Sequence, residues 1–515
     1  MSQTTPRAET SPTVPHRIYV TVLLGAVIVL GCGWRLRGIT EWPSGFHQTR
    51  QYDGAILARI FWLEMTADQL DESQRLWLSR QSKVIYEPPL TELLVALGYV
   101  MGGGERPWLG YLLATAFWLG GGRLVYDIAY QLTGDAYGGI LALAYYLLTP
   151  LGIILSRSFQ PEAAMVFGLC VGLWWLVVRL QDGANWRQTA LAGLICGLAM
   201  LLKPGFAFFP LLATYFVMRW QKLGPRRAVW EPQWLLFVGL LVLPSVIYAY
   251  FFLGSHAGQK FLPQLWFQAN YYRGLWMQIN AAVGWYALAA AIVGACLLVK
   301  QHGRYVGLAL LLAYVLFCAM FSYHSITHSY YHAVAIVIVA VCVAPLARPV
   351  RDACRGLARW QTALCLVVTI VSMVHFSAGA APIIQRHPDF AQQIRFYKQL
   401  GDVCGRGSVV LCLDQNYGST LRYHSWLVTA AWPTTADLAY QRLRGTPIEP
   451  AKPRLDKMIE QQSPDYFIVT DLAALNRQPE LAALLNRRYR KRAEGPSAVV
   501  FDLRQTSQSP GGPAP

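Results

Sequence analysis

Long apolar runs separated by short polar segments make up the first three quarters of the chain. The pattern predicts a multi-pass α-helical membrane protein with about eleven transmembrane helices, because a helix needs roughly 20 apolar residues to cross a bilayer. The shorter runs must include flanking residues or pack tightly inside a bundle. The runs cover residues 18–34, 108–130, 136–155, 163–178, 189–202, 205–220, 234–253, 281–299, 305–321, 333–346 and 362–378.

The pattern changes near residue 388, where short β-branched runs begin to alternate with helical segments. Residues 408–413, 466–470 and 498–503 predict strands, which favours a small α/β unit with a parallel sheet. Helices are expected at 389–400, 455–462 and 472–488. We therefore expect four parts: a disordered cytoplasmic N-terminus, a transmembrane domain with a large first extracytoplasmic loop at 35–107, a soluble α/β domain and a disordered tail, at residues 1–17, 18–380, 381–504 and 505–515.

The composition supports a membrane location and argues against a nucleic-acid partner. Charged residues make up 14% of the chain and hydrophobic residues 54%, whereas a soluble protein carries about a quarter charged residues. The net charge of +16 comes mostly from Lys and Arg in short loops between apolar runs, and no basic-aromatic patch accompanies it.

The distribution of basic loops predicts the orientation. With the N-terminus in the cytoplasm, the basic loops at 179–187, 222–227, 300–304 and 348–359 lie on the same side, as the positive-inside rule requires. Loops 156–162 and 322–332 then face outward. An odd number of spans places the C-terminal α/β domain outside the cytoplasm.

Three polar segments of this outer face carry the candidate chemistry. The first begins at His47 and predicts a helix on the bilayer surface running to Met65. The others are Glu87-Pro88-Pro89 and residues 156–162. Acids at the mouth of a membrane helix are costly unless they are exposed, paired or bound to a cation. We therefore expect one extracytoplasmic cavity to contain Asp53, Glu87, Glu162, Arg50, Arg59 and Arg157. A helix-start charge without chemistry is the alternative for Asp53.

Histidine and cysteine spacings leave two alternatives open. His324, His328 and His332 would share one face of a helix, which suits either a zinc site or interfacial histidines. We favour interfacial histidines because no fourth zinc ligand is evident. Cys404 and Cys412 fall in the α/β part, where they either form a disulfide or remain separate buried thiols.

Five motifs occur in a characteristic order: His47-Gln48-Thr49-Arg50-Gln51-Tyr52-Asp53, Glu87 to Leu90, Arg157 to Glu162, Lys203-Pro204-Gly205 and His328 to Tyr331. In this order the chain resembles the bacterial protein-mannosyltransferase-like family of the GT-C glycosyltransferase superfamily, which includes the lipid A aminoarabinose transferases. Many GT-C enzymes have a second acid directly after the first-loop aspartate, whereas Gly54 follows Asp53 here.

The resemblance implies a GT-C fold in the bacterial cytoplasmic membrane. It also implies transfer of a sugar from a polyprenyl-phosphate donor to an extracytoplasmic acceptor hydroxyl on a lipid, glycan or protein, with inversion. Asp53 would be the base, and Arg50, Arg59 and Lys203 would contact the donor phosphate. Further expected substrate contacts are His47, Gln48, Glu87, Arg157, His328 and Tyr331.

A divalent metal ion shared by Asp53 and Glu162 is an open alternative within this mechanism, since oxygen ligands suit hard cations. No other cofactor is expected. The competing function is a transporter or lipid flippase, but such proteins typically show paired repeats around a midplane site, and the sequence shows no such repeat.

Overall fold

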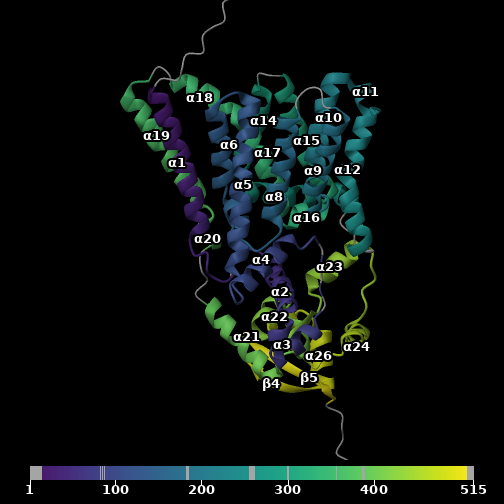
Figure 1. Ribbon diagram of the computed structural model, residues 1–515. Helices are drawn as coiled ribbons and strands as arrows, with labels where there is room; N and C mark the ends of the chain where they lie inside the picture. Colours follow the sequence, from purple (N-terminus) through teal and green to yellow (C-terminus); the bar gives the residue numbers. More distant parts are fainter. Residues whose placement is uncertain are drawn as a thin grey trace, which may run out of the picture.

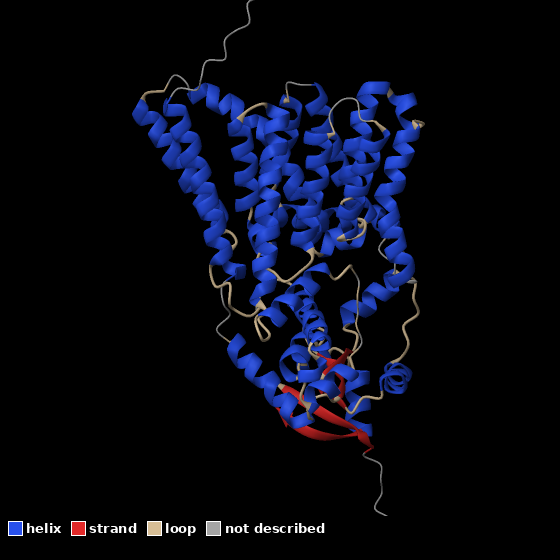
Figure 2. Cartoon of the chain, viewed as in Figure 1, coloured by secondary structure: helices blue, strands red, loops and turns tan. Residues whose placement is uncertain are grey.

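The computed structural model describes residues 14–506 except 44, 82, 84, 86, 181–184, 254–260, 299–300, 355–356 and 385–388. Residues 1–13 and 507–515, which hold most of the predicted disordered ends, therefore lie outside the described residues. The described chain consists of a bundle of long helices, a layer of shorter helices beneath it and a sheet-containing segment at the far end (Figures 1 and 2).

Each predicted apolar run overlaps one or more helices of the bundle. Pro150 begins a new helix directly after α6, because proline is tolerated in the first turn but lacks the N–H that a helix interior needs. The main helices are α1 (Val14–Leu36), α5 (Trp108–Thr133), α6 (Ala136–Leu148), α7 (Pro150–Leu155), α8 (Glu162–Trp174), α9 (Trp186–Leu201), α10 (Phe208–Leu223), α12 (Pro232–Tyr248), α14 (Trp285–Leu297), α15 (Gln301–Met320), α17 (Ala333–Val343) and α19 (Arg359–Ala378).

Within the described residues, six helices are long and apolar enough to cross a membrane on their own. A seventh span results if α13 (Ala269–Ala282) and α14 are one span bent by 84°. Helices α9 and α10 have 16 residues each, so length alone does not make them spans. The chain is therefore a mostly helical protein with several candidate spans, and the number eleven stays a prediction.

The layer beneath the bundle comes from the first large loop. It contains α2 (Gln48–Met65), α3 (Glu72–Ser79) and α4 (Leu90–Met101). Residues 54–60 of α2 are all buried, so the burial runs around the whole helix. Helix α2 is thus enclosed by protein instead of lying along a surface with one polar face, as the sequence had suggested.

The C-terminal segment contains a five-stranded sheet in the order β2-β1-β3-β5-β4. Strand β1 pairs in parallel with β2 and β3, but β5 pairs antiparallel with β3 and with β4. The expectation of a parallel sheet is therefore correct for three strands and wrong for two. The strands are β1 (Val409–Leu413), β2 (Val428–Ala431), β3 (Tyr466–Val469), β4 (Tyr489–Gly495) and β5 (Ala498–Thr506).

Helices cover both faces of this sheet. Along β1, Leu411 and Leu413 pack into one apolar cluster and Val410 and Cys412 into another, as alternating side chains of a strand must. Cys404 packs in the same cluster as Cys412, and both are free thiols, which agrees with the alternative of separate buried thiols. The helices of the whole C-terminal segment are α21 (Phe390–Cys404), α22 (Ser419–Ser425), α23 (Thr435–Leu443), α24 (Ala451–Gln462), α25 (Leu472–Asn476) and α26 (Pro479–Arg488).

Candidate active site

The start of α2 is fixed by neighbouring segments. His47 precedes the helix with a left-handed backbone (φ 43°), and its ring stacks on His328 with 5.8 Å between ring centroids. Gln51 donates to the carbonyl of Phe46 at 2.6 Å and accepts from the backbone N–H of Phe159 at 3.3 Å. These contacts hold the first turns of α2 against the bundle and determine where Asp53 points.

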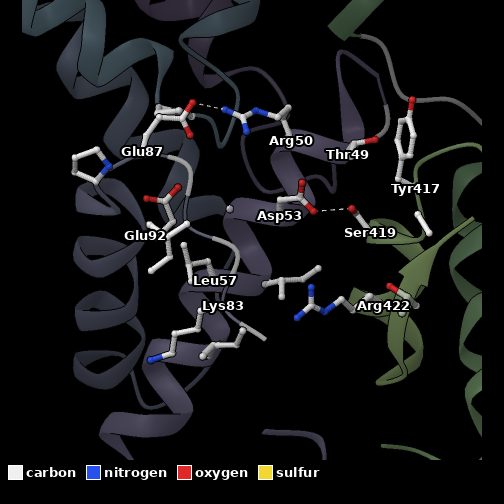
Figure 3. A pocket seen from close by; sticks show the side chains of 18 residues that line it. Thr49, Arg50, Asp53, Leu57, Lys83, Glu87, Glu92, Tyr417, Ser419 and Arg422 are labelled. Carbon is white, nitrogen blue, oxygen red and sulfur yellow. Dashed lines mark hydrogen bonds and ion pairs between the residues drawn. The ribbon is translucent and has the colours of Figure 1, made fainter. Parts of the chain in front are cut away.

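A cavity of about 400 Å³ lies between α2, the segment leading into α4, and the C-terminal segment (Figure 3). Asp53 projects into it from α2, and Ser419 and Arg422 of α22 face it from the other side. The polar and charged residues of its wall are Thr49, Arg50, Asp53, Lys83, Glu87, Glu92, Tyr417, Ser419, Arg422 and Thr429.

Asp53 is partly buried and held by one hydrogen bond across the cavity. The Ser419 hydroxyl donates to Asp53 Oδ1 at 2.6 Å. Burial raises the pKa of the Asp53 carboxyl, while the Ser419 hydrogen bond and the charges of Arg50 and Arg422 oppose that rise. A carboxylate with a raised pKa in a cavity is a candidate proton acceptor.

A chain of ion pairs connects the cavity to the bundle. Arg50 Nη2 lies 2.8 Å from Glu87 Oε1, and Lys203 Nζ lies 3.7 Å from the same oxygen. Lys203 also pairs with Glu162, whose side chain has no exposed surface. The Lys203 ammonium lies 5.1 Å from the ring centre of Tyr330 and 5.8 Å from that of Tyr331. Glu162 therefore joins the site through Lys203.

Two arginines expected in the cavity lie elsewhere. Arg59 is buried, with its Nε 3.0 Å from Glu105 and its Nη1 donating to the carbonyl of Tyr423 at 2.7 Å. It also stacks on Trp426 at 4.4 Å, so it joins α2 to the C-terminal segment. Arg157 donates to the carbonyl of Arg37 and lines a separate small cavity.

The remaining predicted substrate contacts are not among the described residues that line the cavity. Gln48 accepts a hydrogen bond from Asn416 at 2.7 Å, which fastens α2 to the C-terminal segment. His328 and Tyr331 lie in a ring cluster beside His47 and Lys203. Of the predicted site residues, the structure brings Asp53, Arg50 and Glu87 together in the cavity wall, and the others lie outside it.

The three late histidines do not share a helix face. Helix α16 (Ser322–Thr327) ends before His328, and a 3₁₀ turn (Ser329–His332) follows. His332 is hydrogen-bonded to the Tyr314 hydroxyl at 2.5 Å and the Ser325 carbonyl at 2.8 Å. Among the described residues, no three His, Cys, Asp or Glu side chains are grouped so that they could hold a metal ion.

Sequence reasoning missed Lys83, Glu92, Ser419 and Arg422 as cavity residues. Glu92 carried a signal, since it is an acid in the first turn of an apolar helix, like Glu162. Ser419 and Arg422 carried none, because only the fold brings a segment some 366 residues away in sequence against Asp53.

Glu92 lies where Gly54 leaves room for it. A Cβ at Gly54 would be 3.1 Å from the Phe159 carbonyl oxygen and 3.5 Å from Glu92 Oε1. A side chain at position 54 would therefore be tight against the Phe159 carbonyl, and Glu92 of α4 supplies a carboxylate to the same cavity wall as Asp53. Burial raises the pKa of Glu92 from 4.5 to about 7.

Glu92→Gln should make the stability less dependent on pH. The stabilisation from protonated Glu92 is fully present below about pH 4.5 and is lost as the pH rises through about 7. Thermal unfolding should show that the free energy of unfolding of the variant, relative to that of the wild type, rises by up to about 3 kcal/mol from pH 4.5 to pH 8. Parallel pH dependence of the two proteins would contradict a buried, protonated Glu92.

Comparisons with known proteins agree on the fold. ArnT from Cupriavidus metallidurans in the apo state matches with a TM-score of 0.57 and 13% identity, over 95% of this chain and 98% of that chain. Its structure bound to undecaprenyl phosphate matches with a TM-score of 0.52 and 12% identity, over 98% and 100%. An oligosaccharyltransferase from Archaeoglobus fulgidus, tethered with an acceptor peptide, matches with a TM-score of 0.56 and 11% identity, over 93% and 72%.

The sequence itself gives a shorter match. Residues 86–251 match the family described as dolichyl-phosphate-mannose-protein mannosyltransferase. No curated protein sequence matches the chain. Together with the structural matches, this shows that the chain has the fold of the GT-C glycosyltransferases, and it confirms the resemblance found in the motifs.

Proposed function

We propose that this protein is a membrane glycosyltransferase that moves a hexosyl or pentosyl group from a polyprenyl-phosphate donor to an acceptor hydroxyl. The observation that carries the proposal is the cavity between α2 and α22, whose wall contains the Asp53 carboxylate and three cations, Arg50, Lys83 and Arg422. The titles of similar structures name undecaprenyl phosphate and dolichol-phosphate as bound molecules, which supports a lipid phosphate as donor.

In the proposed step, the acceptor oxygen forms a bond to the anomeric carbon while the bond from that carbon to the phosphate oxygen breaks. The acceptor proton passes to Asp53, and the phosphate leaves with the bonding electron pair. Positive side chains stabilise the charge that develops on the phosphate. Attack opposite the leaving phosphate inverts the anomeric configuration.

The contacts revise which cations would meet the phosphate. Arg50, Lys83 and Arg422 line the cavity, whereas Arg59 is enclosed by Glu105, Tyr423 and Trp426. We therefore assign the phosphate to the first three and give Arg59 a docking role. The ring cluster of His47, His328 and Tyr331 beside Lys203 offers a border for the sugar or the lipid.

The residues present fit a shared divalent ion poorly. Glu162 is paired with Lys203, and Asp53 accepts from Ser419. A metal bound by both carboxylates would have to displace the buried ammonium. We therefore derive no step through an ion, and the cations of the chain supply the positive charge in the proposed mechanism.

Binding of undecaprenyl phosphate to the purified full-length protein tests the donor class. The lipid should raise the midpoint of thermal unfolding, and Arg422→Gln should weaken its apparent affinity about tenfold, because one charge-assisted hydrogen-bond donor is lost. Arg226→Gln, at an exposed arginine in α11 (Pro225–Val229) at the opposite end of the bundle, is the matched control. Equal binding by all three proteins would contradict the assignment of the phosphate site.

We also propose that the cavity and the C-terminal segment lie outside the cytoplasm. The basic helices α11 and α18 (Ala347–Cys354) lie at the opposite end of the bundle from the sheet (Figure 1), as the positive-inside rule favours. With the native cysteines replaced, Lys457→Cys should react with an impermeant thiol reagent in spheroplasts and Arg187→Cys should not. The reverse labelling would place Asp53 in the cytoplasm and exclude an extracytoplasmic reaction.

The competing interpretation as a transporter or flippase has less support. The cavity lies beneath the bundle, between α2 and the C-terminal segment, and not in the middle of the long helices (Figures 1 and 3). The structural matches reported above are to glycosyltransferases.

A further inference from the structure

The C-terminal segment contacts the helix that carries Asp53 at several points. Asn416 donates to Gln48 at 2.7 Å, and Arg59 donates to the Tyr423 carbonyl at 2.7 Å. Further along, the His424 ring and the Tyr52 hydroxyl are 2.9 Å apart. These contacts line α22 up along α2 and place its first residue, Ser419, opposite Asp53.

The loop that leads from β1 into α22 is held rigidly. The buried carboxylate of Asp414 accepts from the backbone N–H of Asn416 at 3.0 Å and of Gly418 at 3.3 Å, and from the Tyr397 hydroxyl at 2.9 Å. Gly418 has φ +75°, and a Cβ there would lie 2.4 Å from the sulfur of Cys412. Only glycine fits, so the position of Ser419 is set by the core of the sheet.

We propose that Ser419 is a positioning residue for Asp53, so that the C-terminal segment completes the catalytic site. Ser419 is only 6% exposed, and its hydroxyl donates to Asp53 Oδ1 at 2.6 Å. In Figure 3 the second oxygen of Asp53 points toward the side of the cavity where Arg50 lies. Holding one oxygen leaves the other directed into the cavity, where a general base must meet the acceptor proton.

This inference rests on the proposed function, since it takes Asp53 to be the base. It also makes a prediction about the pKa of the Asp53 carboxyl that does not depend on that role. A hydrogen bond to the charged form of a carboxyl lowers its pKa, so removal of the Ser419 hydroxyl should raise the pKa of Asp53 further. The other charged groups that face the same cavity, from α2, the segment before α4, α4 and α22, are Arg50, Lys83, Glu87, Glu92 and Arg422.

Carbodiimide labelling of the purified full-length protein tests the proposal without any donor or acceptor. Dicyclohexylcarbodiimide reacts with protonated carboxyl groups, and mass spectrometry of peptides gives the labelling rate of Asp53 and of Glu92 at each pH. In Ser419→Ala, Asp53 should label about three to ten times faster than in the wild type at a fixed pH above its midpoint, because a hydrogen bond to the charged form is lost. Glu92 should label as in the wild type.

Two further variants separate positioning from packing. Thr420→Val removes a hydroxyl from the next residue of α22, which is fully buried and whose oxygen makes no hydrogen bond in the described structure. Its Asp53 profile should match the wild type. Ser419→Thr keeps the hydroxyl and should also label as the wild type does.

Unchanged labelling of Asp53 in Ser419→Ala would overturn the proposal. A shift shared equally by Glu92 would overturn it too, because the serine would then act on the whole cavity and not on Asp53. Failure of the proposed function is distinct from both outcomes, since it would appear as a lack of sugar transfer by the wild-type protein while the labelling result still stood.

Discussion

Asp53→Asn should lower the rate of sugar transfer by about a hundredfold to ten-thousandfold, the range that a general base contributes. The amide is nearly the same size as the carboxylate and can still accept the hydrogen bond from Ser419. It cannot take the acceptor proton. Expression, thermal unfolding and binding of undecaprenyl phosphate should therefore stay close to those of the wild type, and the loss should appear in turnover alone.

Glu92→Gln and Glu162→Gln are the matched controls for this substitution. Each removes one buried carboxylate near the cavity without removing the proposed base. The alternative from the sequence, a charge at the start of a helix, is wrong, because α2 begins at Gln48 and has no acid in its first turn. Near-normal turnover in Asp53→Asn would contradict its role as the base.

Lys203→Met should destabilise the protein by about 3–5 kcal/mol, the cost of leaving a buried charge without its partner. Lys203 is 3% exposed and Glu162 is fully buried, so water cannot replace the ammonium. Glu87 keeps Arg50 as a partner, and the unpaired charge would therefore be that of Glu162. Thermal unfolding in detergent, followed by tryptophan fluorescence, measures the loss.

The double variant Lys203→Met/Glu162→Gln should recover most of that loss, because it removes both charges. Lys457→Met is the surface control, since the pair of Lys457 with Glu449 is exposed and should contribute less than about 1 kcal/mol. Equal losses in the single and double variants would show that the packing of Lys203, and not its charge, stabilises this region.

The bundle could be predicted from the sequence because a helix that is apolar over several turns leaves a local pattern. Each predicted run overlaps helix, and breaks come from residues with local effects, such as Pro150. The β4 strand was missed because its sequence, Tyr-Arg-Lys-Arg-Ala-Glu-Gly, is mostly polar and exposed. It is an edge strand that pairs only with β5 and buries little apolar surface.

The candidate site could be predicted only in part. Arg50 lies in the same short motif as Asp53, and Glu87 lies in the next motif along the chain. The structure brings all three to one cavity. Arg59 looked equivalent to Arg50 in the sequence. Its partners are Glu105 and the Tyr423 carbonyl, 46 and 364 residues away, and no local pattern reveals such contacts.

The same reason explains why Ser419 and Arg422 were missed. Their residue types are common, and their importance arises from the docking of α22 on α2. The loop at 414–418 places α22 through Asp414 and Gly418.

Mass spectrometry of cell-envelope lipids and glycans, in cells with and without this protein, tests the central claim most directly. Cells that lack it should accumulate a polyprenyl-phosphate sugar and lose one glycosylated lipid, glycan or protein. The wild-type gene should restore the product and Asp53→Asn should not. An unchanged set of lipid-linked sugars and glycosylated products in all of these strains would contradict the proposal that this protein transfers a sugar from a polyprenyl-phosphate donor.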